Sequence, residues 1–430
     1  MRYSAAMPRP DRQTCSVATA LDLVLALIAP TAPGLLPLSA AAGCVTAERL
    51  LASADLPSVP IAAMDGFAVR VSDLAGAAPA HPITLSVAGN IAAGQPNTNE
   101  LNPQSCIRIM TGATCPVGTD AIVPWEKVQE SAGEITFRAP VVSGQHIRYP
   151  GELQQQGTEI VAAGTLLTAG HLGLIAGDGV DSILVHPRPQ VALITMGDEL
   201  TEPGHAQGHG TIPDSNSISM PALLHHFGAE IVARLRVVDS IERLTRAVQG
   251  LAGLSPDLIV TVGGASSSER DVLGRIYSPG FDLRSLDVNM RPGRPLVCGM
   301  AHGIPLVGLP GNPGAATISA WQFVRPAIRK LAGMVDQTLP LLRLPSLDLL
   351  PNEMGRRTFV RARLQIVDGV VCVGSAGSQA PANQVSLAAM DALIVLDEKT
   401  RSVAVGDLVP VQILDPDRLM ALLAMSPPNT

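Results

Sequence analysis

The sequence of 430 residues has few aromatic side chains, no paired cysteines and no long apolar run. Aromatic residues are 3% and apolar residues 47% of the chain, so a core must be built mostly from Leu, Val, Ile and Ala. The six cysteines are scattered without a C-x-x-C pair, which excludes a disulfide framework and a cysteine zinc site. That pattern favours a reducing compartment, and we expect a cytoplasmic protein of two to four domains.

Clustered positive charge is also missing. The net charge of −7 and the pI of about 5.7 argue against nucleic acid as the main partner. No stretch of roughly 18 uncharged apolar residues predicts a membrane span. One apolar run, residues 17–28, follows two arginines as a signal peptide does, but Asp22 interrupts it. Because Ala18, Leu21 and Leu25 have helical spacing, we predict a buried amphipathic helix there instead.

The most informative stretch is residues 257–271, DLIVTVGGASSSERD. Its apolar, β-branched start is typical of a strand buried on both faces of a parallel sheet. The strand ends at Gly263 and Gly264, and Ser266 and Asp271 follow. Ligands of open α/β sheets bind beyond the carboxyl ends of strands, where glycines allow close backbone approach and hydroxyls can bind anions. The alternative is a flexible Gly/Ser surface loop.

Two further stretches have the same character. Residues 190–199 form a buried-type strand that ends near Glu199, and residues 304–313 form another. In the latter, Asn312 is predicted to cap a helix whose first position is Pro313, where proline is favoured. Three strands that end in glycine and polar residues predict a doubly wound α/β domain with a composite crevice.

Two carboxylates each have two interpretations. Asp65 precedes Gly66 in a pair that is a strong signal for a tight turn, and it is either part of that turn or a carboxylate presented by it. Asp239 ends a predicted strand and directly precedes a helix, so it is either a helix cap or a site residue.

Helix boundaries follow from proline and spacing. Residues 36–52 are predicted as a second N-terminal helix. A later helix is predicted to begin near Ser219, because Pro221 fits only in a first helical turn.

The flanking regions are predicted to be rich in strands. Residues 1–188 are assigned to N-terminal helices and the β-rich domains that they pack against, 189–335 to the α/β domain, and 336–430 to a C-terminal β-barrel domain. In the last, Asp368 and Gly369 predict a hairpin turn. The fold class is therefore multidomain α/β plus β.

Eight short motifs occur within residues 60–315 in a fixed order. They are MDGFAVR (64–70), IAAGQP (91–96), RIMTGA (108–113), PVGTDA (116–121), TMGDEL (195–200), DSN (214–216), RPGRP (291–295) and GLPGNP (308–313). With these motifs in register, the chain resembles the molybdopterin molybdenumtransferases, the MoeA-type proteins related to the E domain of gephyrin. The resemblance implies insertion of molybdate into adenylylated molybdopterin, with release of AMP.

The resemblance also implies a set of site residues. Elongated homodimers are expected, with the site between the α/β domain of one subunit and a β-rich domain of the other. The residues matched to the family's site are Asp65, Thr111, Glu199, Asp239, Asp271, Arg148, Arg291, Pro310 and Pro313. The strand-end pattern adds Gly263, Gly264, Ser266 and Asn312. A molybdoenzyme or the upstream adenylyltransferase is a further candidate partner.

The expected ligands are anions, and their chemistry agrees with these residue types. A helix N-terminus after Asn312 contributes only about 0.3–1 kcal/mol to anion binding. Micromolar affinity needs about 8 kcal/mol, so arginines and a metal must supply the rest. Asp65, Glu199 and Asp271 are hard oxygen ligands suited to Mg²⁺ or another divalent cation.

The chain departs from the family pattern at several positions. Leu153 stands where relatives usually have an acid, Asp287 where they have lysine, and Gly314-Ala315 where they have Val-Ser. These departures leave open a divergent or non-catalytic paralogue that binds or chaperones the cofactor. A second rival, the enzyme class that adenylylates molybdopterin, needs only the α/β domain, and the β domains on both flanks argue against it.

Overall fold

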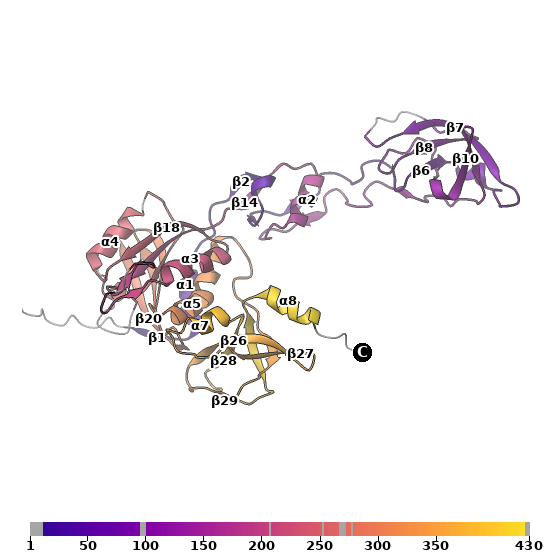
Figure 1. Cartoon of the computed structure of the whole chain (residues 1–430). Coiled ribbons are helices and arrows are strands. Elements are labelled where there is room, and N and C mark those ends of the chain that lie inside the picture. Colours follow the sequence, from indigo (N-terminus) through magenta and orange to yellow (C-terminus); the bar gives the residue numbers. More distant parts are fainter. Residues whose placement is uncertain are drawn as a thin grey trace, which may run out of the picture.

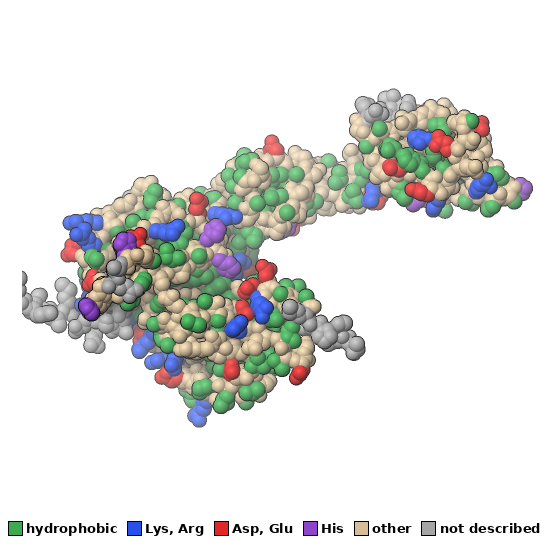
Figure 2. Space-filling model, in the orientation of Figure 1, with side chains coloured by type: hydrophobic (Ala, Val, Ile, Leu, Met, Phe, Trp, Pro, Cys, Tyr) green, Lys and Arg blue, Asp and Glu red, His purple; other side chains and the backbone are tan. Residues whose placement is uncertain are grey.

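The protein is an elongated molecule with its α/β domain near one end and a β-rich lobe at the other (Figure 1). The computed structural model describes residues 12–94, 100–205, 208–251, 253–265, 272–276 and 278–425. Figure 2 shows a narrow neck before the β-rich lobe, and acidic and basic side chains interspersed over the visible face. Among the described residues, no helix is both long and apolar enough to span a bilayer.

A seven-stranded sheet forms the centre of the α/β domain. Its order is β1-β20-β22-β23-β19-β15-β18. The strands are β1 (Gln13–Cys15), β15 (Gln190–Met196), β18 (Glu230–Val237), β19 (Leu258–Val262), β20 (Phe281–Val288), β22 (Pro295–Ala301) and β23 (Ile304–Leu309). β18, β15, β19 and β23 are mutually parallel, whereas β22 is antiparallel to both of its neighbours. The chain passes from β15 to β18 on one side and returns to β19 on the other, which makes a topological switch point.

Helices cover both faces of this sheet, which confirms the predicted doubly wound fold. One face packs against α1 (Val17–Ala26), α3 (Asn216–His226), α5 (Pro313–Ser319) and α6 (Arg325–Leu331), and the other packs against α4 (Ile241–Gly250). Val191 and Leu193 of β15 face the first layer, and Ala192 and Ile194 face the second. Burial on both sides explains why this strand is continuously apolar.

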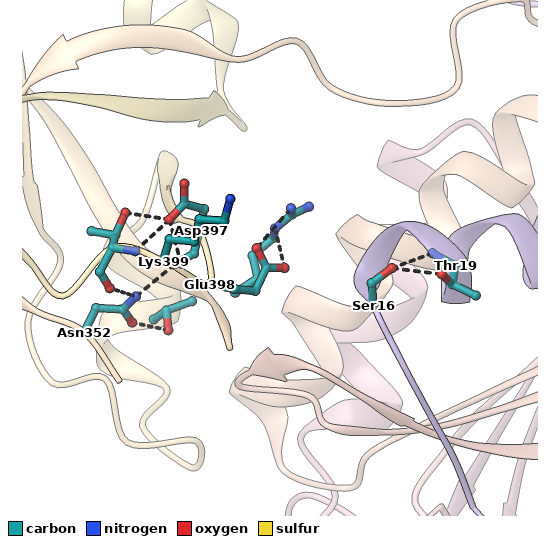
Figure 3. A network of polar contacts seen from close by, with 9 residues as sticks. Ser16, Thr19, Asn352, Asp397, Glu398 and Lys399 are labelled. Carbon is teal, nitrogen blue, oxygen red and sulfur yellow. Dashed lines mark hydrogen bonds and ion pairs between the residues drawn. The ribbon is translucent and has the colours of Figure 1, made fainter. Parts of the chain in front are cut away.

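The first helix packs in the α/β core, so the prediction that it lies against the β-rich domains is wrong. β1 adds to the edge of the large sheet beside β20, and this pairing places α1 on the sheet. The Ser16 hydroxyl caps α1 by accepting a hydrogen bond from the Thr19 N–H at 3.0 Å (Figure 3). The buried face is Val17, Ala20 and Val24. Ala18 of the predicted face is exposed, because apolar residues surround the helix and spacing alone could not select the buried side.

Residues 36–52 form no α-helix, in contrast to the prediction. They contain the end of β2 (Gly34–Pro37), a short 3₁₀ turn, β3 (Val45–Thr46) and β4 (Leu50–Leu51). β2 and β3 both pair with β14 (Ser182–His186), which lies far along the chain, and this tertiary pairing overrides the local helical pattern.

The helix predicted to begin near Ser219 begins three residues earlier, so Pro221 lies inside it. The Asp214 carboxylate accepts the Ser217 N–H at 2.9 Å, and the Ser217 hydroxyl donates to the Asp214 carbonyl. These contacts start the helix at Asn216, which places Pro221 beyond the first turn, where it has no backbone N–H for the i→i−4 ladder.

Small β elements build the middle and distal parts. The middle part combines the β2-β14-β3 sheet with α2 (Ala169–Gly177), and β4 with β13 (Glu159–Val161). The distal sheet has the order β10-β11-β7-β8-β6-β9. Its strands are β6 (Gly66–Val69), β7 (Ile83–Ile91), β8 (Ser105–Ile109), β9 (Ala121–Pro124), β10 (Val128–Ser131) and β11 (Glu134–Phe137). Before β6, the strand β5 (Ile61–Ala62) pairs with β12 (Ile147–Arg148), so the Asp65–Gly66 turn does not join a hairpin.

The C-terminal domain is a closed β structure. It contains β24 (Leu342–Pro345), β26 (Arg357–Val367), β27 (Val370–Ser375), β28 (Ala392–Leu396) and β30 (Leu408–Ile413), with β25 (Leu350–Pro351) paired to β29 (Ser402–Val403). The predicted hairpin joins β26 to β27. A bridge between Ser346 and Val373 closes the ring from β24 to β27. The helices α7 (Val385–Ala389) and α8 (Pro416–Met425) complete this part.

The C-terminal domain is joined to the α/β domain by backbone pairing. β21 (Met290–Arg291) leaves the large sheet and pairs in parallel with the start of β26, at Arg357 and Thr358. Asn352 stabilises the adjoining turn by donating to the carbonyls of Asp397 and Thr400 (Figure 3).

We expect Val24→Ala to lower the free energy of unfolding of the α/β domain by about 1–3 kcal/mol, because Val24 is fully buried against the sheet. The matched control is Ala18→Ser on the exposed side, which should change it by no more than about 0.5 kcal/mol. Urea unfolding followed by Trp321 fluorescence in a Trp125→Phe background measures this, since Trp321 lies in the same core cluster. Equal effects of the two substitutions would contradict the described packing of α1.

Candidate functional site

A cleft of about 1230 Å³ lies at the carboxyl ends of β15, β19 and β23. These ends belong to parallel neighbours, so Gly197, Gly263 and Pro310 meet at one edge beside the switch point. β20 runs in the same direction as β23, and Asp287 opposes Pro295 in the β20–β22 ladder. The connection between those strands therefore reaches the same edge and brings its arginines to the cleft.

The cleft gathers most of the residues predicted from the α/β domain. Those that line it are Glu199, Asp239, Gly263, Gly264, Arg291, Pro310, Asn312 and Pro313. Ser266 and Asp271 lie outside the described residues. The roles of all these residues in binding and catalysis stay predictions.

Asp65, Thr111 and Arg148 do not line this cleft, because they belong to the N-terminal β-rich region, which contributes no residue to it. Asp65 follows β5, and its carboxylate accepts hydrogen bonds from both the N–H and the hydroxyl of Thr111, each at 2.7 Å. The backbone N–H first, and then the hydroxyl, hold the pKa of Asp65 below its usual value. Asp65 is therefore a fixed anionic acceptor at neutral pH. Arg148 lies 3.6 Å from Glu152 in an exposed ion pair.

The two glycines after β19 are required by the protein backbone itself. Gly263 has a φ of +91° and Gly264 a φ of +71°, in the left-handed region that favours glycine. A Cβ at Gly263 would collide with the carbonyl oxygen of Met196, and one at Gly264 would lie 2.7 Å from the Met196 sulfur. Close approach to the end of β15 therefore requires glycine at these two positions, and their part in ligand binding stays a prediction.

Asp239 is not the cap of the following helix. Ser240 occupies that position, and its hydroxyl accepts the Arg243 N–H. The Asp239 N–H donates to the Asp198 carboxylate at 3.0 Å, which holds the loop at the mouth of the cleft. The cap interpretation of Asp239 is therefore wrong, and its role in the site stays a prediction.

Asn312 stands at the N-cap of α5, but its side chain makes no capping hydrogen bond among the described residues. Its carbonyl accepts the Ala316 N–H at 2.8 Å. The neighbouring Gly311 carbonyl accepts a hydrogen bond from the Asn216 amide, also at 2.8 Å. The loop after β23 is therefore held by α3, through a residue of the DSN motif to which we had assigned no role.

Asp287 is paired with an arginine. The Asp287 carboxylate, with a side chain 13% exposed, forms a hydrogen-bonded ion pair with Arg294, which lines the cleft. This hydrogen bond and the charge of Asp287 raise the pKa of Arg294. The acid at the expected lysine position therefore orders a neighbouring arginine. A second of the departures, Leu153, is an exposed residue outside the cleft.

The C-terminal domain forms one wall of the cleft, and we did not predict this wall from the sequence. Its residues include Glu353, Arg356, Gln379, Pro381 and Gln384. Gln384 donates to the Ser215 hydroxyl at 2.8 Å, and the Pro381 carbonyl accepts the Gly314 N–H at 2.8 Å. In the sequence, Gly377-Ser378-Gln379 matches the family pattern only loosely, which is too weak a signal to predict this wall.

The departure at Gly314 has a packing reason. A Cβ there would collide with the guanidinium of Arg361 and lie 2.7 Å from the Pro381 carbonyl oxygen. Arg361 is fully buried, and it donates to the carbonyls of Ser378 and Ala380 at 2.9 Å each. Gly314 therefore leaves room for the arginine that holds the cleft wall.

The described residues of one chain offer an incomplete set of ligands for a divalent cation. Glu199 and Asp239 bring carboxylates to the cleft. The buried Asp214 is engaged by the Thr195 hydroxyl and the Ser217 N–H. Within the described ranges, no three His, Cys, Asp or Glu side chains are grouped to hold a metal ion. The predicted trio of Asp65, Glu199 and Asp271 is thus not assembled by the described part of a single chain.

Three family models match successive parts of the chain. They are the MoeA N-terminal region (domain I and II) at residues 15–179, a probable molybdopterin binding domain at 192–330, and the MoeA C-terminal region (domain IV) at 343–414. A Pyrococcus horikoshii structure described as a molybdopterin biosynthesis MoeA protein has the same fold. Its TM-score is 0.80, with 24% identity over 94% of this chain and all of that one.

Curated relatives are similar in sequence to this chain over most of its length. Molybdopterin molybdenumtransferase 2 of Mycobacterium tuberculosis is 35% identical over 385 residues, 88% of this chain and 94% of the relative. Molybdopterin molybdenumtransferase of Nostoc is 32% identical over 363 residues, 83% of each chain. The fold is thus that of a multidomain MoeA-type protein. The chain belongs to the molybdopterin molybdenumtransferase family, as the sequence motifs predicted.

We expect Thr111→Val to raise the pKa of Asp65 only part of the way to its ordinary value. The substitution removes the hydroxyl donor but keeps the backbone N–H, which is the larger cause of the lowered pKa. A carbon NMR titration of the Asp65 carboxylate measures the change, with Asp65→Asn identifying the signal. Thr84→Val in the same lobe, where Thr84 contacts Thr136, is the control and should have no effect. An unchanged pKa in Thr111→Val would contradict the described contact.

Proposed function

We propose that the protein inserts molybdate into adenylylated molybdopterin and releases AMP, forming molybdenum cofactor. The supporting observation is the cleft at the switch point, where Arg291, Arg294 and Arg356 converge beside the N-terminus of α5. Guanidinium groups and backbone N–H groups suit phosphate and molybdate oxygens. A volume of about 1230 Å³ accommodates a substrate larger than a single oxoanion.

The residues of the cleft divide into two kinds in this proposal. Arg291 and the loop of Pro310, Asn312 and Pro313 bind the anionic groups. Glu199 and Asp239 present carboxylates on the opposite side, near Gly263 and Gly264. Ser266 and Asp271 are assigned to the site from the sequence alone.

We further propose a homodimer in which a second copy completes the site. Asp65 and Thr111 adjoin β6 and β8, which lie at the far end of the elongated molecule from the α/β domain, and this supports a second copy as the source of Asp65, Thr111 and Arg148 (Figure 1). In that arrangement Mg²⁺ or another divalent cation is held by Asp65 of one copy with Glu199 and Asp271 of the other. Bound there, the cation would neutralise charge on the pyrophosphate group.

Other features remain part of the same proposal. The domain limits 1–188, 189–335 and 336–430 are retained as working boundaries, although β1 and α1 pack in the α/β core. We propose a cytoplasmic location, and a molybdoenzyme or the adenylyltransferase as further partner. The ion pair of Asp287 with Arg294 weakens the argument for a non-catalytic paralogue, because it keeps an ordered arginine in the cleft.

We expect Glu199→Gln and Asp65→Asn each to lower AMP release from adenylylated molybdopterin and molybdate at least tenfold, which is about 1.4 kcal/mol. A mixture of the two variants, dissociated and reassembled, should recover about a quarter of the wild-type activity. Half of the random dimers are mixed, and each of these has one intact site.

The matched control is Glu398→Gln, a carboxylate of the C-terminal domain that pairs with Arg357 outside the cleft, and it should keep wild-type activity. Failure of the mixture to recover activity would place both carboxylates in one chain's site. Wild-type activity in both single variants would contradict the proposed function.

A further inference from the structure

Within the cleft, one carboxylate lies between two arginines that come from different domains. The Oε2 atom of Glu353 is 3.7 Å from the Nη1 atom of Arg291 and 3.9 Å from the Nη1 atom of Arg356. All three side chains line the cleft. Arg291 belongs to β21 of the α/β domain, whereas Glu353 and Arg356 belong to the C-terminal domain.

These ion pairs are loose. Both distances exceed the roughly 2.7–2.9 Å of a charge-assisted hydrogen bond. The side chains of Arg291, Glu353 and Arg356 are 63%, 55% and 36% exposed, so solvent screens their attraction. Exposed pairs of this kind contribute little to stability. The carboxylate can therefore be displaced by a ligand that offers better geometry.

The positions of the two arginines do not depend on Glu353. The β21–β26 ladder pairs Arg291 with Thr358 and Met290 with Arg357, next to Arg356. The Arg357 N–H also donates to the Asn289 carbonyl at 3.0 Å. Removal of the Glu353 charge should thus leave both guanidinium groups at the cleft.

The third arginine of the cleft has a different partner. Arg294 is held by Asp287, whose side chain is mostly buried and forms a direct hydrogen bond. That pair is tighter than either contact of Glu353. Glu353 is therefore the carboxylate that an incoming anion can most readily displace.

We propose that Glu353 is an internal competitor for the anionic substrate. It occupies Arg291 and Arg356 in the free protein and moves away when an oxoanion such as molybdate, or a phosphate group of the pterin substrate, binds them. This inference rests on the proposed function. It states that the anion must displace Glu353 from the guanidinium groups of Arg291 and Arg356. By weakening every single-point contact, Glu353 would favour ligands that engage both arginines at once.

Calorimetric titration of molybdate alone into the full-length protein tests this. At about 50 mM salt, Glu353→Gln should bind molybdate roughly three- to tenfold more tightly than wild type, because the competing charge is gone while the side-chain volume is kept. At about 500 mM salt the difference should shrink, since exposed charges are screened. Arg291→Ala should bind more weakly than wild type. Glu398→Gln, the carboxylate paired with Arg357 outside the cleft, should match wild type.

The outcomes separate the competitor role from the proposed function. If Arg291→Ala weakens binding but Glu353→Gln does not strengthen it, the competitor role is overturned and the anion site remains. If Arg291→Ala binds as wild type, or no variant binds, the anion is not held here and both proposals fail. If Glu353→Gln loses affinity only when Mg²⁺ is added, Glu353 is a metal ligand, and the competitor role is again overturned.

Discussion

The cleft depends on a two-residue backbone pairing between domains. β21 emerges from the large sheet and pairs with the start of β26, so the C-terminal domain begins where the cleft does. Phe359, Leu393 and Val395 of the C-terminal domain also pack in the core cluster of the α/β domain, and hydrogen bonds run from Gln384 to Ser215 and from Gly314 to Pro381. Together these contacts give Glu353, Arg356 and the loop of residues 377–384 a fixed place beside the strand ends.

Electrostatic balance in the cleft is a second constraint. Three arginines converge there: Arg291 and Arg356 share the exposed Glu353, whereas Arg294 pairs with the mostly buried Asp287. A half-buried pair orders its arginine, whereas an exposed one can exchange partners with a ligand. Asp287 stands where relatives have lysine, yet its mostly buried carboxylate holds Arg294 in place at the cleft.

Much of the α/β domain could be predicted because the burial of its strands is visible in short stretches of sequence. Strands buried on both faces read as continuous apolar runs, so residues 190–196, 258–262 and 304–309 were evident, and so was the cleft at their ends. The site's C-terminal wall could not be predicted, since contacts between residues far apart in the sequence fix it, and such contacts leave no periodic signal. The helix prediction for residues 36–52 was wrong for a related reason, because pairing with the distant strand β14 decides their conformation.

The contact of Gly314 with Arg361 and Pro381 limits how domains can be exchanged between homologous proteins. The first turn of α5 and the loop at residues 378–381 belong to different domains, yet each shapes the space that the other occupies. In a relative with valine at the position of Gly314, the loop of the C-terminal domain is expected to fit a larger side chain. Transplanting that C-terminal domain into this protein would place this loop beside a glycine. A chimaera joined at the domain boundary would therefore still separate residue 314 from the loop that it contacts. Residue 314 and the loop should be exchanged together.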